Sequence, residues 1–397
     1  MVRGQAHEKR QTDYEIELEQ IDRDISELED GALTIPIDAG KATKFAYRLY
    51  HRASLTGNFA ELEAVESAID DAIRQIGPWA DLCLLKANLD FKLHRLVDAR
   101  HDLEMVPKLA YSPQARALSA DLDLQEGRYE DARKGYEAVI KANRTWDNLV
   151  RLAYLRARMG EVEGAERLYI EAEDEITAKE MRSYAWVELQ RGLLELAHGR
   201  YESAWAYYER ANEAYSGYWL VDQHIAELLG AQGKFDEAVA LYERVIVRVP
   251  RPEFQQALGD LYVSMGEPAR ARPWHEKALA AYLESVQRGD VHYLHHLADF
   301  YAAVREDGGE AVRWARKDLE LRQNFSTQAA LAWALYRDGR FAEALDAMHK
   351  ALSSGVRDAK LFFQAAMIHL AAGRTEEGKR FLREAAEINP RYHEVHG

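Results

Sequence analysis

The sequence contains a single cysteine, Cys83, among its 397 residues. One cysteine excludes an internal disulfide, and it also excludes the paired-cysteine motifs that bind zinc or carry redox chemistry. Such low cysteine use is typical of a reducing compartment, so we expect a cytoplasmic location. Removal of a leader ahead of the first residue would instead allow a periplasmic or secreted location.

Long apolar runs and an excess of basic residues are also missing. No stretch of 18 apolar residues occurs, so we expect no membrane insertion. Lys and Arg total 52 against 67 Asp and Glu, which gives a formal net charge of -15. Because nucleic-acid binding depends on basic patches that contact phosphates, we expect no nucleic-acid partner.

Sequence signatures of catalysis are absent as well. There is no phosphate-binding loop, no G-x-S-x-G elbow and no H-E-x-x-H pair. The sequence therefore predicts a protein that is not an enzyme and that needs no cofactor.

Only nine prolines and 24 glycines interrupt the chain, which favours a mostly helical fold. A phrase of the form Gly-x-x-x-x-small recurs, as in "GRYEDA" at 127, "GRYESA" at 199 and "GKFDEA" at 233. Together with weaker copies it occurs ten times, and successive copies are separated by 33 to 40 residues. Such a period is the signature of a repeat architecture.

Each repeat is predicted to contain two helices. An amphipathic helix precedes the glycine, which ends it, and a second helix follows with apolar residues at i, i+3, i+4 and i+7. A small residue early in the second helix lets the two helix axes approach. An aromatic residue four positions later fills the space between repeats, and this position holds Tyr136, Tyr169, Tyr208 and Tyr242.

This pattern resembles the tetratricopeptide repeat family, most closely in "LGDLYVSMGEPARARPWHEKAL". The resemblance implies an all-α, right-handed superhelical solenoid of about ten helix-turn-helix repeats over residues 41–390, in which the first helix of each pair lines a concave groove. The second and fifth units depart from the family, with Asp90 and Glu195 at positions that are usually aromatic. Two insertions, "EITAKEM" after the fourth unit and "AYLESVQRGD" after the seventh, are expected to lengthen helices.

The two ends of the chain fall outside the repeats. Residues 1–40 are predicted to form an acidic arm with a capping helix, because Tyr14, Leu18, Ile21, Ile25 and Leu28 form a short apolar stripe. This helix either docks on the first repeat of its own chain or swaps onto a second copy. Residues 391–397 form a short tail. Homo-oligomers through the arm or the terminal repeats are therefore one expectation.

Three histidines cluster in "VHYLHHLADFY". On a helix, His292, His295, His296 and Asp299 would all fall within a 100° arc, and His292 with His296 would have i,i+4 spacing. Such a set could supply part of a first shell for a divalent transition metal. It could also sense pH, if the imidazoles become charged below about pH 6. His275, in contrast, occupies the inter-repeat aromatic position and is predicted to pack in the core.

The family resemblance implies that the second, fifth and ninth positions of each first helix face the groove. Those positions and their neighbours supply ten candidate peptide-binding residues: Glu253, Gln256, Asp260, His292, His295, His296, Asp299, Trp333, Tyr336 and Arg337. This set lacks the Lys/Asn/Arg pattern by which some family members bind a terminal carboxylate. It favours a basic or amphipathic peptide instead.

Two functions follow from these residues. The first is a non-catalytic scaffold or adaptor that binds a peptide or helix of a partner protein in the concave groove. The alternative is a protein that responds to a metal or small ligand through His292, His295, His296 and Asp299.

Overall fold

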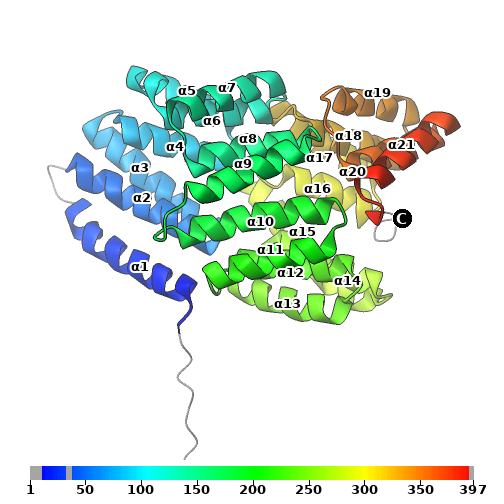
Figure 1. The fold of residues 1–397 in the computed structure, drawn as a ribbon, viewed down its shortest axis with the longest axis horizontal. Helices are drawn as coiled ribbons and strands as arrows, with labels where there is room; N and C mark the ends of the chain where they lie inside the picture. Colours follow the sequence, from blue (N-terminus) through cyan, green and yellow to red (C-terminus); the bar gives the residue numbers. More distant parts are fainter. Residues whose placement is uncertain (1–10, 33–37, 393–397) are drawn as a thin grey trace, which may run out of the picture.

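A computed structural model describes residues 11–32 and 38–392, and Figure 1 shows a solenoid of stacked helices. These residues form 21 α-helices and one short 3₁₀ helix, with no strand among them. The helices span α1 Asp13–Ala32, α2 Ala39–Thr56, α3 Glu61–Ile76, α4 Ala80–Lys92, α5 Leu96–Glu104, η1 Pro107–Tyr111, α6 Pro113–Gln125, α7 Tyr129–Ala142, α8 Trp146–Arg158, α9 Val162–Asp174, α10 Met181–Ala197, α11 Tyr201–Ala214, α12 Trp219–Ala231, α13 Phe235–Arg248, α14 Pro252–Ser264, α15 Pro268–Gln287, α16 Leu294–Ala303, α17 Gly308–Leu321, α18 Phe325–Arg337, α19 Phe341–Leu352, α20 Ala359–Ala371 and α21 Thr375–Ile388.

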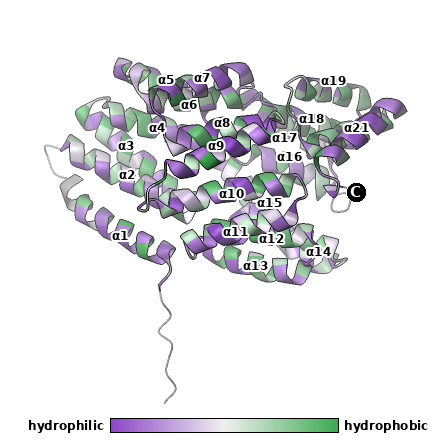
Figure 2. Ribbon diagram, in the orientation of Figure 1, coloured by the Kyte–Doolittle hydropathy of each residue, from purple (hydrophilic) through white to green (hydrophobic). Residues whose placement is uncertain are grey.

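The helices after α1 form ten hairpins, from α2–α3 to α20–α21, and the two helices of each hairpin pack against each other. The predicted all-α architecture of about ten repeats is confirmed. First helices of consecutive units also touch, as α10 touches α12 and α16 touches α18. Figure 2 shows hydrophobic and hydrophilic residues alternating along most helices, as expected where one face is buried.

The residues of the repeat phrase explain how the two helices of each hairpin pack together. The small residues of the phrase are buried, with Ala132, Ala165, Ala204 and Ala238 each at 0% exposure. The tyrosines four positions later are buried too. These residues therefore have the packing roles that the repeat predicts.

The two insertions have different outcomes. The second insertion lengthens α15 to 20 residues, as predicted, before Gly289 ends it with φ of 94°. The first lies mostly outside helices, because α9 ends at Asp174 and α10 begins only at Met181. The inserted residues themselves are mostly not helical, but the helix that follows them is longer, since α10 has 17 residues against 13 in α8 and 13 in α12.

Successive turns of the solenoid lie directly on one another. Trp219 donates its indole N–H to the carbonyl of Leu55 at 2.9 Å, and the backbone N–H of Arg357 donates to the carbonyl of Arg158 at 2.9 Å. The turn at Gly160, with φ of 79°, lies against Arg357, so that a Cβ there would come within 2.8 Å of its side chain. Units far apart in sequence are therefore in contact.

Helix α1 docks on its own chain in this structure. It packs along α2, and Tyr14 and Ile21 of its apolar stripe are buried. The backbone N–H of Tyr14 donates to the carbonyl of Ser216 at 3.2 Å, and Tyr215 donates its hydroxyl to Glu17 at 2.5 Å. The helix thus joins the first unit to the connection between the fifth and sixth units (Figure 1).

Within the described ranges, no helix combines the length and the apolar character that a membrane crossing requires.

Candidate functional site

The histidine cluster spans a turn and the beginning of a helix. Helix α16 begins at Leu294, so His292 lies in the turn ahead of it. The expectation that His292 and His296 share one helix face is therefore wrong. The reason is the second insertion, which ends α15 at Gln287 and continues through Gly289 into a turn that reaches Tyr293.

His292 is buried against the first unit. Its ring stacks on Phe59, with centroids 4.6 Å apart and planes 4° from parallel. The side chain is 8% exposed, and neither ring nitrogen has a hydrogen-bond partner. Leaving a buried polar group unpaired costs about 1–3 kcal/mol. A residue that bears this cost is a candidate for a role beyond packing.

His295 is held by carboxylates. Its Nδ1 lies 3.1 Å from Oδ2 of Asp318, and its Nε2 lies 3.7 Å from Oδ2 of Asp299. Asp318 also accepts hydrogen bonds from Arg322, at 2.7 Å for the closest pair. Lys360 approaches Asp299 at 3.8 Å. His295 and Asp299 line a small cavity of about 50 Å³ between α16, α18 and the start of α20.

His296 faces the core instead. It stacks on Tyr282, with centroids 5.7 Å apart and planes 10° from parallel. Tyr282 in turn donates its hydroxyl to Gln256 at 3.0 Å. Burial lowers the pKa of His296 and lowers the pKa of His292 to about 4. Burial disfavours the charged imidazole, which argues against the interpretation that these two histidines sense pH near 6.

We expect the His292 ring to stay neutral between pH 8 and 5.5. Its folded pKa lies below the unfolded value near 6.5, so the unfolded state takes up the proton first and stability is lost as the pH falls from about 6.5 to about 4. Following the ring C–H signals by NMR, beside a short histidine peptide in the same buffers, checks this. A midpoint above pH 6 would contradict it.

Within the described part of the chain, no group of three or more His, Cys, Asp or Glu side chains is arranged to hold a metal ion. His292 stacks on Phe59, whereas His295 points to Asp318. A metal site at His292, His295, His296 and Asp299 stays a prediction.

The preceding unit places its candidates differently. Glu253 forms an ion pair with Arg251, whose guanidinium lies 4.9 Å from the centre of the Phe59 ring. Asp260 is exposed and lies 2.8 Å from Nε2 of His275. His275 is 9% exposed, so its predicted place in the core is confirmed.

The aromatic candidates of the following unit lie on α18. Trp333 and Tyr336 stack with ring centroids 4.8 Å apart, and Arg337 pairs with Glu306 at 2.8 Å. The predicted residues do not form one continuous surface. His292 lines a cavity beside the first unit, His295 and Asp299 line the small one, and Asp260 lines a third.

The third cavity is the largest of these, with a volume of about 930 Å³. Its floor comes from the first helices α12 and α14, with small or apolar residues at Ala226, Gly230, Ala257 and Leu261. The last unit closes its other side through the start of α20 and the segment after α21, including Lys360. Sequence reasoning missed the α12 residues, although small residues recurring along a first helix are a usable signal.

These features define an all-α helical-repeat protein with a groove along the first helices. Family comparison then identifies the repeats: models described as tetratricopeptide repeat match residues 195–261, 326–357 and 359–392. These three segments are tetratricopeptide repeats, the kind of repeat that the sequence pattern predicts.

Similar proteins carry the same repeats. The chain is 24% identical over 211 residues to the TPR repeat-containing protein YpiA of Bacillus subtilis (strain 168), a match that covers 53% of this chain and 41% of that protein. The chain thus spans less than half the length of that relative.

Among solved structures, a tetratricopeptide repeat protein from Parabacteroides merdae is 18% identical with a TM-score of 0.38, covering 61% of this chain and 93% of that one. The APC/C hetero-tetramer Cut9–Hcn1 is 13% identical with a TM-score of 0.43, covering 96% and 93%. A monomeric IFIT1 mutant with Gppp-AAAA is 14% identical with a TM-score of 0.46, covering 93% and 94%.

Proposed function

We propose that the protein is a non-catalytic scaffold that binds a segment of a partner protein in the groove along α12 and α14. The observation that carries this proposal is the cavity of about 930 Å³ on the first-helix face. This volume lies at the upper end of the usual range for a ligand site, about 300–1,000 Å³. Tetratricopeptide repeats are typical of proteins that bind other proteins, which supports it.

The chemistry of the groove suggests the kind of segment. Small residues on the floor allow a peptide backbone or an apolar side chain to approach closely. Three carboxylates, on Glu227, Asp260 and Asp358, line the cavity against the cationic Lys360 and Arg391. The net charge of the chain is also negative, at -15. An amphipathic segment with basic side chains complements this surface in both shape and charge.

Selection of a displayed peptide library on the purified protein tests the proposal. Enriched peptides should combine apolar and basic residues, and synthetic copies should bind when measured by fluorescence anisotropy. Ser264 is exposed and lines the groove, so Ser264→Arg should fill part of it and add a repelling charge. We expect this change to weaken binding at least about tenfold.

The matched control is Val247→Arg. Val247 is 88% exposed on α13 and does not line the groove, so the same arginine there should leave affinity unchanged. Selected peptides that bind the wild type and Ser264→Arg equally well would place their site elsewhere and overturn the proposal.

A further inference from the structure

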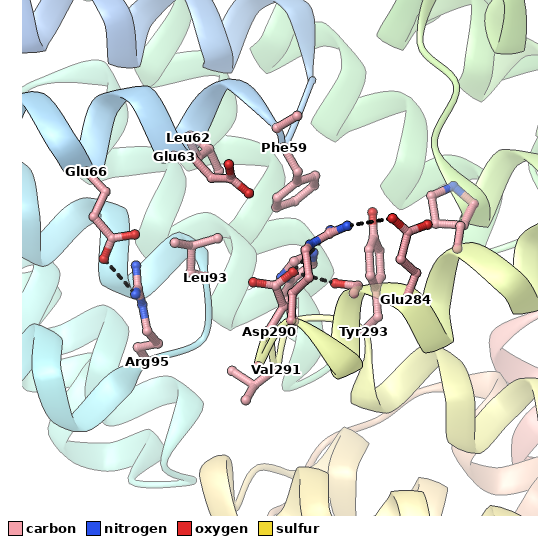
Figure 3. A pocket seen from close by; sticks show the side chains of 17 residues that line it. Phe59, Leu62, Glu63, Glu66, Leu93, Arg95, Glu284, Asp290, Val291 and Tyr293 are labelled. Atoms are coloured by element: carbon pink, nitrogen blue, oxygen red, sulfur yellow. Dashed lines mark hydrogen bonds and ion pairs between the residues drawn. The ribbon is translucent and has the colours of Figure 1, made fainter.

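A cavity of about 280 Å³ separates two parts of the solenoid that are distant in sequence. The turn after α2 and the start of α3 form one wall, and the α15–α16 turn forms the other. Figure 3 shows Phe59, Leu62 and Glu63 on the first wall, with Asp290, Val291 and Tyr293 facing them across the opening. A molecule bound here would touch both walls at once.

The cavity has an apolar part. Phe59, Leu62, Leu93 and Val291 all line it, and the ring of His292 extends the apolar surface by stacking on Phe59. An aliphatic or aromatic group of a ligand would lose its contact with water on this surface, which favours binding.

Its charged part is mainly acidic. Four carboxylates line the cavity against two guanidinium groups: Glu63, Glu66, Glu284 and Asp290 against Arg95 and Arg288. Arg95 is bound to Glu66 at 2.7 Å, and Arg288 lies 3.2 Å from Glu284 and 3.3 Å from Asp290. Each guanidinium is therefore paired with at least one carboxylate, although Nη2 of Arg95 has no hydrogen-bond partner. Glu63 is exposed and makes no hydrogen bond or ion pair with another described residue.

The imidazole of His292 adds an observation that packing does not explain. The side chain lines this cavity, is 92% buried, and neither nitrogen has a partner. A neutral imidazole carries one donor and one acceptor, and the acceptor can take a hydrogen bond from an ammonium group. Neither nitrogen is open to the cavity in this structure, so a ligand offers the missing partner once the ring turns toward it.

We propose that this cavity binds a small organic cation, an ammonium group on an apolar stem, and that the bound cation bridges the first unit to the α15–α16 turn. The ammonium group lies among Glu63, Asp290 and the His292 ring, and the stem lies along Phe59 and Val291. Anions of the same size are excluded by the excess of carboxylates. Because the ligand touches both walls, binding stabilises the contact between successive turns of the solenoid.

Three matched probes test this inference on the full chain: pentylamine hydrochloride, 1-pentanol and sodium pentanoate. Pentylamine should give saturable shifts of the His292 ring signals by NMR, and pentanoate should give none. Hydrogen exchange should slow in both residues 57–66 and residues 288–293 on addition of pentylamine. Equal responses to all three probes, no response to pentylamine, or protection of only one segment would overturn it.

Two variants separate the binding role from folding. Glu63→Gln removes an exposed, unpaired carboxylate and should weaken pentylamine binding several-fold without changing the fold. His292→Phe keeps the stacked ring but removes both nitrogens, so it should weaken binding at least tenfold and raise the apparent Tm by about 1–2 °C without ligand. Unchanged affinity in both variants, or a lower Tm for His292→Phe, contradicts the assignment.

Ser264→Arg should leave pentylamine binding intact, because Ser264 lines the α12–α14 groove and not this cavity. The outcome at this cavity is therefore independent of the peptide-binding proposal.

Discussion

Replacing Asp318 with asparagine should destabilise the eighth unit by about 3 kcal/mol, because it leaves a buried cation without its counter-charge. Asp318 is 1% exposed on α17 and accepts hydrogen bonds from Arg322, whose side chain is only 12% exposed. Burial alone would raise the pKa of Asp318, but the hydrogen bonds from His295 and Arg322 bring it below its usual value. The carboxylate is therefore charged in the fold, and an amide cannot replace that charge.

The same substitution should release His295. Its Nδ1 lies 3.1 Å from Asp318, whereas its other contact, to Asp299, is longer at 3.7 Å. An amide oxygen accepts a hydrogen bond from imidazole more weakly than a carboxylate does. The NMR signals of the His295 ring should broaden or shift, while those of His292, which stacks on Phe59, should stay in place.

Repeat proteins do not always unfold as one unit, so the loss of stability has to be measured locally. Hydrogen exchange of the amides in α16, α17 and α18 does this. Asp346→Asn is the matched control. Asp346 is exposed on α19 and makes no ion pair with another described residue, so its change should lie within about 0.5 kcal/mol of zero. A loss below about 1 kcal/mol for Asp318→Asn would mean that Arg322 finds another partner.

The repeats could be predicted because each is a local feature. The glycine at a hairpin turn, the small residue after it and an aromatic such as Tyr136 lie within about ten residues of each other, and together they determine one hairpin. Helix periodicity and turn chemistry act over the same short range. For this reason the number of units and the buried positions of Ala132 and Tyr136 follow from the sequence.

The candidate site could not be predicted to the same extent, because its environment comes from distant units. Phe59 stacks on His292, and nothing near either residue indicates the other. Their contact depends on the small rotation between each pair of neighbouring units, summed over most of a superhelical turn. An insertion such as the one before His292 changes the total rotation between the two distant units. The expectation that His292 lies on a helix also assumed that the insertion only lengthens α15.

A departure from the repeat pattern leads to the second prediction. Asp90 replaces the usual aromatic residue in the second unit, and the structure places it, 2% exposed, beside Asp102 on the next helix. Arg95 pairs with one oxygen of Asp90 at 2.7 Å. The other oxygen, and one oxygen of Asp102, have no donor in the described part of the chain. Two such carboxyl groups can satisfy each other only by sharing a proton.

Burial, opposed by Arg95 and reinforced by the hydrogen bond with Asp102, raises the pKa of Asp90 to about 7. A raised pKa means that the folded state keeps a proton that the unfolded chain has already released near pH 4. The stability of the second unit should therefore fall as the pH rises from about 4 to 7 and level off above 7. The two groups titrate as a pair, so the transition belongs to both.

Asp102→Asn should remove this dependence. Its amide can donate to Asp90 without needing a proton, so the variant should be more stable than the wild type by about 2 kcal/mol at pH 8, with little difference at pH 5. Hydrogen exchange of the α4 and α5 amides at both pH values measures the difference. Asp98→Asn, an exposed change on the same helix, should show no such gain at pH 8. If Asp102→Asn is less stable than the wild type at pH 8, the two carboxyl groups do not share a proton. In that case Asp90 would lower the stability of the second unit only because it lacks the packing of an aromatic side chain, and not because of its charge.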